Sequence, residues 1–240
     1  MFKIPKEKLE LYDPDVFSVI RAKLLRNLKG MLDFMIVYNS KEYKPKVSVY
    51  DFNTVINIPE KIVQPESVDI LITSPPYGDS HTTVAYGQFS RLSNEWLGIK
   101  GAESIDRKLM GGKKLREFVK FDLIKLDNTI DRIYEKDRNR ALEVCSFYYE
   151  LLMSIKNIAG TIKKDGLVCY VIGNRMVKGI QLPTNETVIN FYERFGFKHI
   201  ETFLREIPNK RMPHKNSPSN IKGETSSTIM FEYIIILKKV

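Results

Sequence analysis

The sequence predicts an α/β fold, in which short apolar strands alternate with helices around one sheet. Three apolar runs of strand length carry this prediction, at residues 68–72, 167–172 and 232–237. The first run ends just before two prolines, and the second lies between two glycines. With 240 residues, of which 43% are hydrophobic, the chain is long enough to bury one sizeable core.

The first 45 residues are predicted to be mostly helical. Asp13 precedes Pro14, and an aspartate N-cap followed by proline is a common helix start. Apolar residues then recur at helical spacing on one face, with basic residues elsewhere. Residues 46–50 alternate apolar and polar, which predicts a short strand.

The run at residues 68–72 is predicted to be a buried strand that ends at Ser74-Pro75-Pro76-Tyr77. Neither proline can donate to a sheet ladder, and each fixes one φ angle, so the turn is stiff. Ser74 is pushed toward extended geometry because it precedes a proline. The motif therefore lies in a rigid loop at the carboxyl end of a strand, where open α/β sheets bind ligands.

Residues 79–126 are polar and irregular, and we expect their aromatic side chains, among them Trp96, to pack inward. A long helical pattern follows over residues 126–162, and the strand 167–172 comes next. Further predictions are a helix opening at 184–187, a strand at 199–207, a basic loop at 208–218 and the last strand at 232–237.

Ser74-Pro75-Pro76-Tyr77 after an apolar strand resembles the catalytic motif of the amino-group DNA methyltransferases, which use S-adenosylmethionine (AdoMet). The resemblance implies a Rossmann-like AdoMet-dependent methyltransferase fold, with a mostly parallel sheet and an antiparallel last strand. It leaves open whether this fold is incomplete at its N-terminus. It also implies a single catalytic domain over residues 1–240, with 79–126 as a lid or DNA-facing insert.

The same resemblance gives each motif residue a role. Ser74 Oγ and the Pro75 carbonyl would accept the two N–H bonds of an exocyclic amino group, which localises the nitrogen lone pair toward the methyl donor. Pro76 would stiffen the loop, and Tyr77 would stack on a base flipped out of the duplex. A proline turn that merely closes a strand is the structural alternative.

A motif that begins with serine favours cytosine N4 as the methylated atom, with adenine N6 second. Other amino methyltransferases, acting on RNA or on protein glutamine, carry similar motifs with Asn or Asp in the first position. A different class also stays open, namely a catalytically silent subunit that binds nucleic acid.

Cofactor contacts are expected from three residues by the same resemblance. Asp51 would accept from the adenine amino group, Phe52 would cover the ring, and Asp13 would bind the ribose, with Glu10 as the alternative acid. A polar turn and an ordinary helix cap explain these residues as well.

The resemblance also implies a glycine-rich loop, roughly Phe-x-Gly-x-Gly, at the end of the first strand, and this sequence does not contain it. Glycine allows the close backbone approach that the methionine part of AdoMet requires. Three explanations are open: a second polypeptide supplies the loop, the chain is a fragment, or the enzyme is impaired. We expect a second polypeptide.

The chain carries 38 Lys and Arg against 29 Asp and Glu, a formal net charge of +9. Such a surplus suits a polyanion such as double-stranded DNA, although many basic residues of a protein only face solvent. The candidate DNA contacts are His81, Arg91, Lys113, Lys114, Lys210, Arg211 and Lys215.

Cys145 and Cys169 lie far apart on apolar stretches and are expected to be reduced thiols of a cytoplasmic protein. The sequence shows no metal-binding pattern, no signal peptide and no apolar run of membrane-span length.

Overall fold

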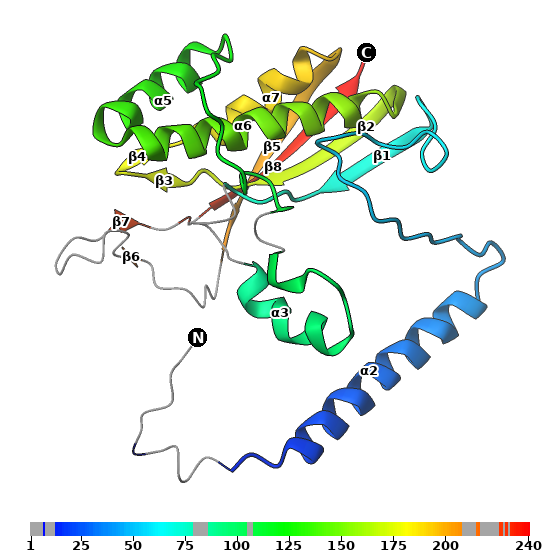
Figure 1. Ribbon diagram of the computed structural model, residues 1–240. Coiled ribbons are helices and arrows are strands. Elements are labelled where there is room, and N and C mark those ends of the chain that lie inside the picture. The colour runs from blue at the N-terminus through cyan, green and yellow to red at the C-terminus, as the bar shows by residue number, and fades with distance from the viewer. Residues whose placement is uncertain are drawn as a thin grey trace. The chain divides into compact units, whose positions relative to one another are not determined.

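The computed structural model describes Glu7 and residues 13–78, 86–104, 108–207, 215–216, 226–227, 229 and 231–240. These residues fall into two compact units, Met1–Tyr50 and Asp51–Val240 (Figure 1). The sequence predicted one domain over the whole chain and gave no sign of a division at Tyr50.

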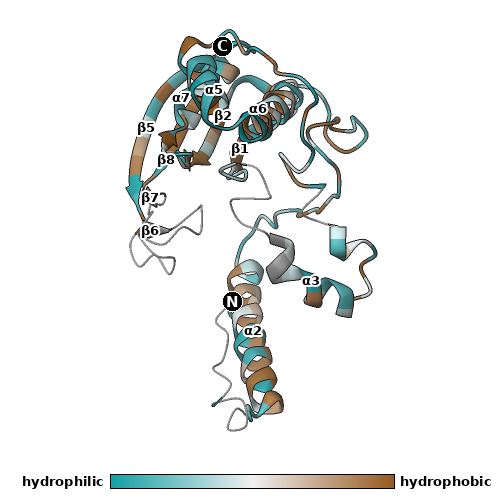
Figure 2. Cartoon of the chain, turned by 60° about the vertical axis from the view of Figure 1, so that its left-hand side comes forward, coloured by the Kyte–Doolittle hydropathy of each residue, from teal (hydrophilic) through white to brown (hydrophobic). Residues whose placement is uncertain are grey.

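The first unit contains one helix, α2 (Val16–Asn39). Its N-cap is Asp15 and not the expected Asp13, because the Asp15 carboxylate accepts from the backbone N–H of Ser18 at 2.9 Å. The helix continues through Gly30, and none of its residues is buried within the described chain. Figure 2 shows hydrophobic residues along the whole of α2.

The strand expected at residues 46–50 is absent, and the prediction was wrong. This stretch is irregular, and its apolar side chains are exposed, Val49 by 93%. Alternation alone does not make a strand, because a strand needs a neighbour to receive its backbone hydrogen bonds. No described strand pairs with residues 46–50.

The second unit is built on a four-stranded sheet in the order β1-β2-β8-β5 (Figure 1). Strands β1 (Val68–Thr73) and β2 (Ile162–Ile172) are parallel, whereas β8 (Phe231–Lys239) is antiparallel to both β2 and β5 (Phe197–Glu206). Strands β1, β2 and β5 therefore run in one direction, and β8 runs in the opposite direction. The expected α/β class and the antiparallel last strand are confirmed.

Helices α6 (Arg138–Ala159) and α7 (Thr184–Glu193) cover one face of this sheet (Figure 1). Tyr192 of α7 packs edge-on against Tyr170 of β2, with ring centroids 5.7 Å apart. Both tyrosines are almost fully buried. Short two-stranded sheets, β3 (Met176–Val177) with β4 (Ile180–Gln181) and β6 (Lys215–Asn216) with β7 (Ser226–Ser227), complete the described strands.

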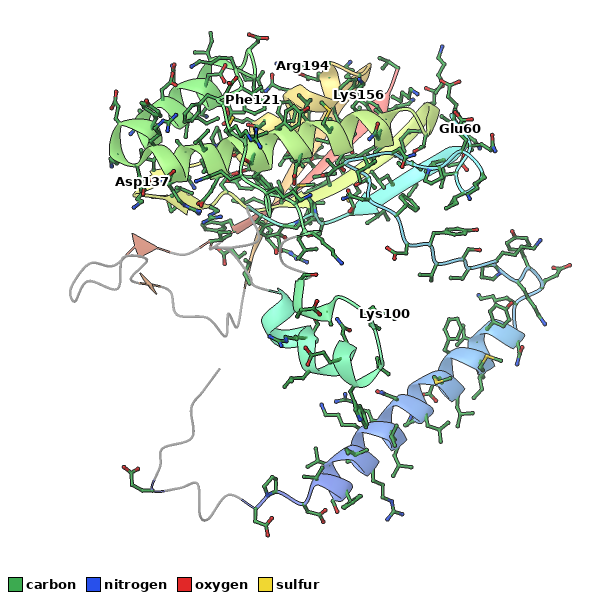
Figure 3. All side chains as sticks on the ribbon, in the orientation of Figure 1. Glu60, Lys100, Phe121, Asp137, Lys156 and Arg194 are labelled. Carbon is green, nitrogen blue, oxygen red and sulfur yellow. The ribbon has the colours of Figure 1, made fainter. Side chains whose placement is uncertain are left out.

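The single helix expected over 126–162 is two helices, α5 (Ile124–Lys136) and α6. Asp137 separates them with an extended backbone, and its carboxylate caps α6 by accepting from the Arg140 N–H at 3.0 Å. Figure 3 shows Asp137 where the two helices meet. Because the apolar period continues across Asp137, the sequence pattern alone predicts one helix.

The two faces of the sheet differ in burial. Paired residues share a face, and Val168 and Leu237 on the helix-covered face are both completely buried. On the opposite face, Ile70 is 57% exposed and Ile72 73% exposed. The expectation that the first strand is buried was therefore wrong, because β1 is an edge strand and no described element covers its second face.

Part of the insert at residues 79–126 is more regular than expected. It contains helix α3 (Tyr86–Trp96) and a 3-10 turn, η1 (Ala102–Ser104). Trp96 is 86% exposed, so the prediction that it packs inward was wrong. None of the described helices is both long and apolar enough to cross a membrane.

Candidate active site

The Ser-Pro-Pro-Tyr loop leaves the carboxyl end of β1, as the sequence predicted. β1 ends at Thr73, and no residue from Ser74 to Gly78 belongs to a strand. Ser74 is exposed, the two prolines and Tyr77 are half-buried, and Gly78 is buried. The Ser74 hydroxyl therefore lies at a solvent-facing position on a stiff loop, where another molecule can reach it.

Tyr77 is held through its hydroxyl. It donates to Glu232 Oε1 at 2.8 Å, and it accepts from Ser74 Oγ at 3.3 Å. Glu232 lies at the start of β8, opposite Arg205 of β5 in the register. The Arg205 guanidinium donates to Glu232 Oε2 through Nε, at 2.9 Å, and through a second nitrogen.

The Tyr77 ring lies against Gly173, the residue that follows β2. A Cβ placed on Gly173 would lie 2.8 Å from Cδ2 and 3.1 Å from Cε2 of Tyr77, and 2.9 Å from Cγ2 of Ile229. Two of these distances are below 3.0 Å, which packed Cβ atoms essentially never show, and the third is tighter than most packed contacts. The sequence therefore needs glycine at position 173 so that the ring can approach the end of β2.

Two pKa values follow from this arrangement. Burial raises the pKa of Tyr77 to about 12. For Glu232, partial burial alone would raise the pKa, but the hydrogen bonds from Arg205 and Tyr77 outweigh it and the pKa is lowered. At neutral pH the loop therefore carries a protonated tyrosine that donates to an ionised glutamate.

The end of β2 is also tied to α7. Asn174 donates from Nδ2 to Asn185 Oδ1 at 2.8 Å, and its own Oδ1 accepts from the Asn185 N–H at 3.0 Å. These reciprocal bonds fix the turn that carries Gly173, and so fix the surface on which the Tyr77 ring rests. The Tyr77–Gly173 contact therefore brings the residue that follows β2 beside the loop.

The three cofactor candidates are divided between the two units of the chain. Asp13 belongs to the first unit, whereas Asp51 and Phe52 open the second. Asp51 is exposed and Phe52 is half-buried. The stretch after them is anchored to α6, where Thr54 bonds Ser154 at 2.8 Å.

Of the DNA candidates, three have described side chains. Arg91 pairs with Glu95 within α3 at 2.7 Å, so a neighbouring carboxylate balances its charge. Lys114 donates to Asn139 Oδ1 at 3.1 Å, and Lys113 is exposed. His81, Lys210 and Arg211 lie outside the described residues, and of Lys215 only the backbone, in β6, is described.

Glu232 and Arg205 were not among the candidates from the sequence. One signal for them is present, because Glu232 is the only carboxylate in the otherwise apolar and basic run 231–239. A charged side chain at the start of an apolar strand indicates a polar partner close to that same position. The identity of that partner depends on the strand order, which periodicity does not give.

A known protein resembles this chain in sequence. It is 38% identical over 250 residues to the Type II methyltransferase M.MvaI of Kocuria varians, an alignment that covers 99% of this chain and 55% of the relative. The chain therefore spans about half the length of the curated relative that it matches. No protein-family model matches it.

Solved structures give only distant likenesses. A putative DNA modification methylase from Thermus thermophilus matches with a TM-score of 0.37 and 16% identity, over 78% of this chain and 52% of that one. A crystal structure of the same methylase with S-adenosyl-L-methionine matches with a TM-score of 0.34 and 15% identity, over 77% and 49%.

Proposed function

We propose that this chain is the catalytic part of an AdoMet-dependent DNA methyltransferase that modifies an exocyclic amino group of a flipped base. The observation that carries the proposal is the Ser-Pro-Pro-Tyr loop, held at the carboxyl end of β1 by Glu232 and Gly173. The similarity of nearly the whole chain to half of a Type II methyltransferase supports it.

The loop residues have separate tasks in this proposal. An exocyclic amino nitrogen is a weak nucleophile because its lone pair is delocalised into the base. Ser74 Oγ and the Pro75 carbonyl accept its two N–H bonds and localise the lone pair. Pro76 keeps that carbonyl in place, and the Tyr77 ring offers a stacking surface for the base.

AdoMet supplies the methyl group in this reaction. Asp51 and Phe52 fit its adenine end, since an exposed carboxylate can accept from the adenine amino group and a neighbouring ring can cover the base. Asp13 is the candidate for the ribose. The described chain offers no glycine-rich backbone for the methionine end.

Cytosine N4 is the favoured target because the motif begins with serine, and adenine N6 is second. Methylation of an RNA or protein amino group is the alternative reaction. A non-catalytic nucleic-acid-binding subunit is the alternative of another class. AdoMet binding and methyl transfer separate these alternatives.

We further propose that a second polypeptide supplies the glycine-rich loop. In the described residues β1 pairs only with β2, so one edge of β1 has no strand beside it. Ile70 and Ile72 are more than half exposed on the uncovered face. An open, apolar edge strand is usually covered, and a partner that adds strands here would bring its loop to the catalytic side of β1.

Calorimetry with AdoMet tests that partnership. The chain alone should bind AdoMet weakly or not at all, and it should bind after the neighbouring gene product is added. Association should also raise the melting temperature. Tight binding and turnover by the chain alone would refute the need for a partner.

DNA contacts in this proposal come from basic residues of the insert and of the loop after β5. Lys113 and Lys114 are exposed, and Arg91 is exposed but paired. Phosphate contacts position a protein on the duplex without reading its sequence. The remaining candidates are His81, Lys210, Arg211 and Lys215.

Two substitutions test the catalytic assignment. Ser74→Ala removes one acceptor, and Tyr77→Ala removes a stacking surface worth roughly 1–3 kcal/mol per base. Each should reduce methyl incorporation into DNA strongly and leave the circular dichroism spectrum unchanged. Ser48→Ala and Tyr149→Ala, at exposed positions, are the matched controls. Full activity in both loop variants would exclude this site.

A further inference from the structure

Four side chains, two from the loop after β1 and two from neighbouring strands, form one hydrogen-bonded line. Ser74 donates to Tyr77 at 3.3 Å, Tyr77 donates to Glu232 at 2.8 Å, and Arg205 donates to the other oxygen of Glu232 at 2.9 Å. The line connects the exposed loop after β1 with the start of β8 and the end of β5.

The direction of each bond in this line follows from its far end. Arg205 only donates, and the ionised Glu232 only accepts, so the Tyr77 proton must point toward Glu232. The lone pairs of the Tyr77 oxygen then face Ser74, which can donate its own proton to them. A serine hydroxyl has one proton and two acceptor lone pairs, so donating to Tyr77 leaves both lone pairs of Ser74 for another donor.

We propose that Glu232 and Arg205 are positioning residues that set this proton direction and so keep Ser74 Oγ an acceptor for the target amino group. The inference rests on the proposed function, and it adds two residues that do not touch the base. It also gives the Tyr77 hydroxyl a role separate from that of the Tyr77 ring.

The surroundings of the pair suit this role. The Glu232 side chain is 14% exposed, whereas Arg205 is 60% exposed. The carboxylate is thus shielded where it meets Tyr77, and the guanidinium reaches solvent on the far side. The two residues face each other across the β5–β8 ladder, so backbone pairing holds their side chains together.

The Ser74–Tyr77 contact, at 3.3 Å, is the longest in the line. It is also longer than most O–H···O bonds, which measure roughly 2.5–3.0 Å. Hydrogen bonds at catalytic groups often tighten when the substrate is present. A donor from the base to Ser74 would strengthen the bond that Ser74 itself donates, because hydrogen bonds in a chain polarise one another.

A purely structural role for Glu232 makes a different prediction. In that case the carboxylate would act through its pair with Arg205 across the β5–β8 ladder, and its loss would lower activity whether or not Tyr77 carries a hydroxyl. In the proposed role, Glu232 acts only through that hydroxyl. Tyr77→Phe keeps the ring and removes the hydroxyl, so it distinguishes the two roles.

The experiment is a double-mutant cycle with Tyr77→Phe and Glu232→Gln. Single-turnover methyl transfer is measured with the complete enzyme, including the partner polypeptide if AdoMet binding requires it, at saturating DNA and AdoMet. Each single variant should transfer about tenfold more slowly, which corresponds to one misdirected hydrogen bond. The KM for DNA should stay within about twofold, because the stacking ring remains.

The double variant decides the question. It should be no slower than Tyr77→Phe alone, because Glu232 then has no hydroxyl to orient. Arg205→Lys should retain more of the rate than Arg205→Ala. Glu201→Gln, an exposed carboxylate on β5, is the control and should leave the rate unchanged.

Equilibrium unfolding of the wild type, the two single variants and the double variant gives a readout that does not depend on activity. The effects of Tyr77→Phe and Glu232→Gln on the unfolding constant should be non-additive, because they remove one shared bond. This inference alone would be overturned if the wild type is active and the rate losses of Tyr77→Phe and Glu232→Gln multiply in the double variant. A Glu232→Gln variant with the wild-type rate would overturn it as well. A wild-type complex without methyl transfer would refute the proposed function, and this inference with it.

Discussion

Gly173→Ala is the perturbation whose effect is best defined by the structure. The added Cβ would lie 2.8 Å from Tyr77 Cδ2 and 2.9 Å from Ile229 Cγ2, where ordinary contact begins near 3.4 Å. The ring must therefore move by about 0.6 Å or more. Gly173 is not in the left-handed backbone region, so the backbone itself tolerates alanine.

Two effects should follow from this shift. Overpacking of this kind costs about 1–3 kcal/mol of folding free energy. A misplacement of about 1 Å at a reacting group can slow catalysis about 100-fold, so a smaller shift of the ring should slow methyl transfer by at least about tenfold. The loss in rate should exceed what the fraction of unfolded protein explains.

The assay combines thermal unfolding with methyl incorporation at saturating DNA. Gly160→Ala is the matched control, because its nearest contact would be 3.6 Å from Asn157 O and its φ is −66°. In a Tyr77→Ala background the stability cost of Gly173→Ala should fall, since the ring is gone. Wild-type stability and rate in Gly173→Ala would refute the packing described here.

Three further predictions concern stability and binding. Asp137→Ala should cost about 1 kcal/mol, because it removes the cap of α6. The ion pair with Lys178 and the cap lower the pKa of Asp137, so its contribution to stability is present above pH 3.8 and is lost as the pH falls further. Acid unfolding of the wild type and of Asp137→Ala measures this loss. Because the pKa of Tyr77 is raised to about 12, its contribution to the stability of the folded state is complete below pH 10 and is lost as the pH rises through about 12. In alkali the stability of Tyr77→Phe should therefore fall less steeply with pH than that of the wild type. Neutralising Lys210, Arg211 and Lys215 together should reduce the slope of log K against log salt by up to about 3; an unchanged slope would mean that these residues only face solvent.

Local chemistry made much of the fold predictable from the sequence. Apolar runs predicted β1, β2 and β8, and the prolines after β1 and Gly173 after β2 marked where those two strands end. These signals are local, because a proline ends a strand wherever it lies. The place of the Ser-Pro-Pro-Tyr loop followed from them directly.

The errors arose where tertiary contacts decide. Residues 46–50 have the alternation of a strand but no described strand to pair with, and Asp137 interrupts a helical pattern whose apolar period continues. Which residues meet at the end of β1 depends on the order of the strands. That order brings Glu232 to Tyr77 across 155 positions of sequence, a relation that no local pattern contains.

Because Glu232 of β8 follows Tyr77 by 155 positions in the sequence, the ribosome makes the two partners of this hydrogen bond at different times. A ribosome that adds about 5–20 residues per second releases Tyr77 roughly 8–30 s before Glu232. During that interval the loop has its prolines but no carboxylate to hold its tyrosine. A nascent chain stalled before β8 would therefore carry the whole motif without the carboxylate that holds Tyr77, and the synthesis of β8 supplies that carboxylate.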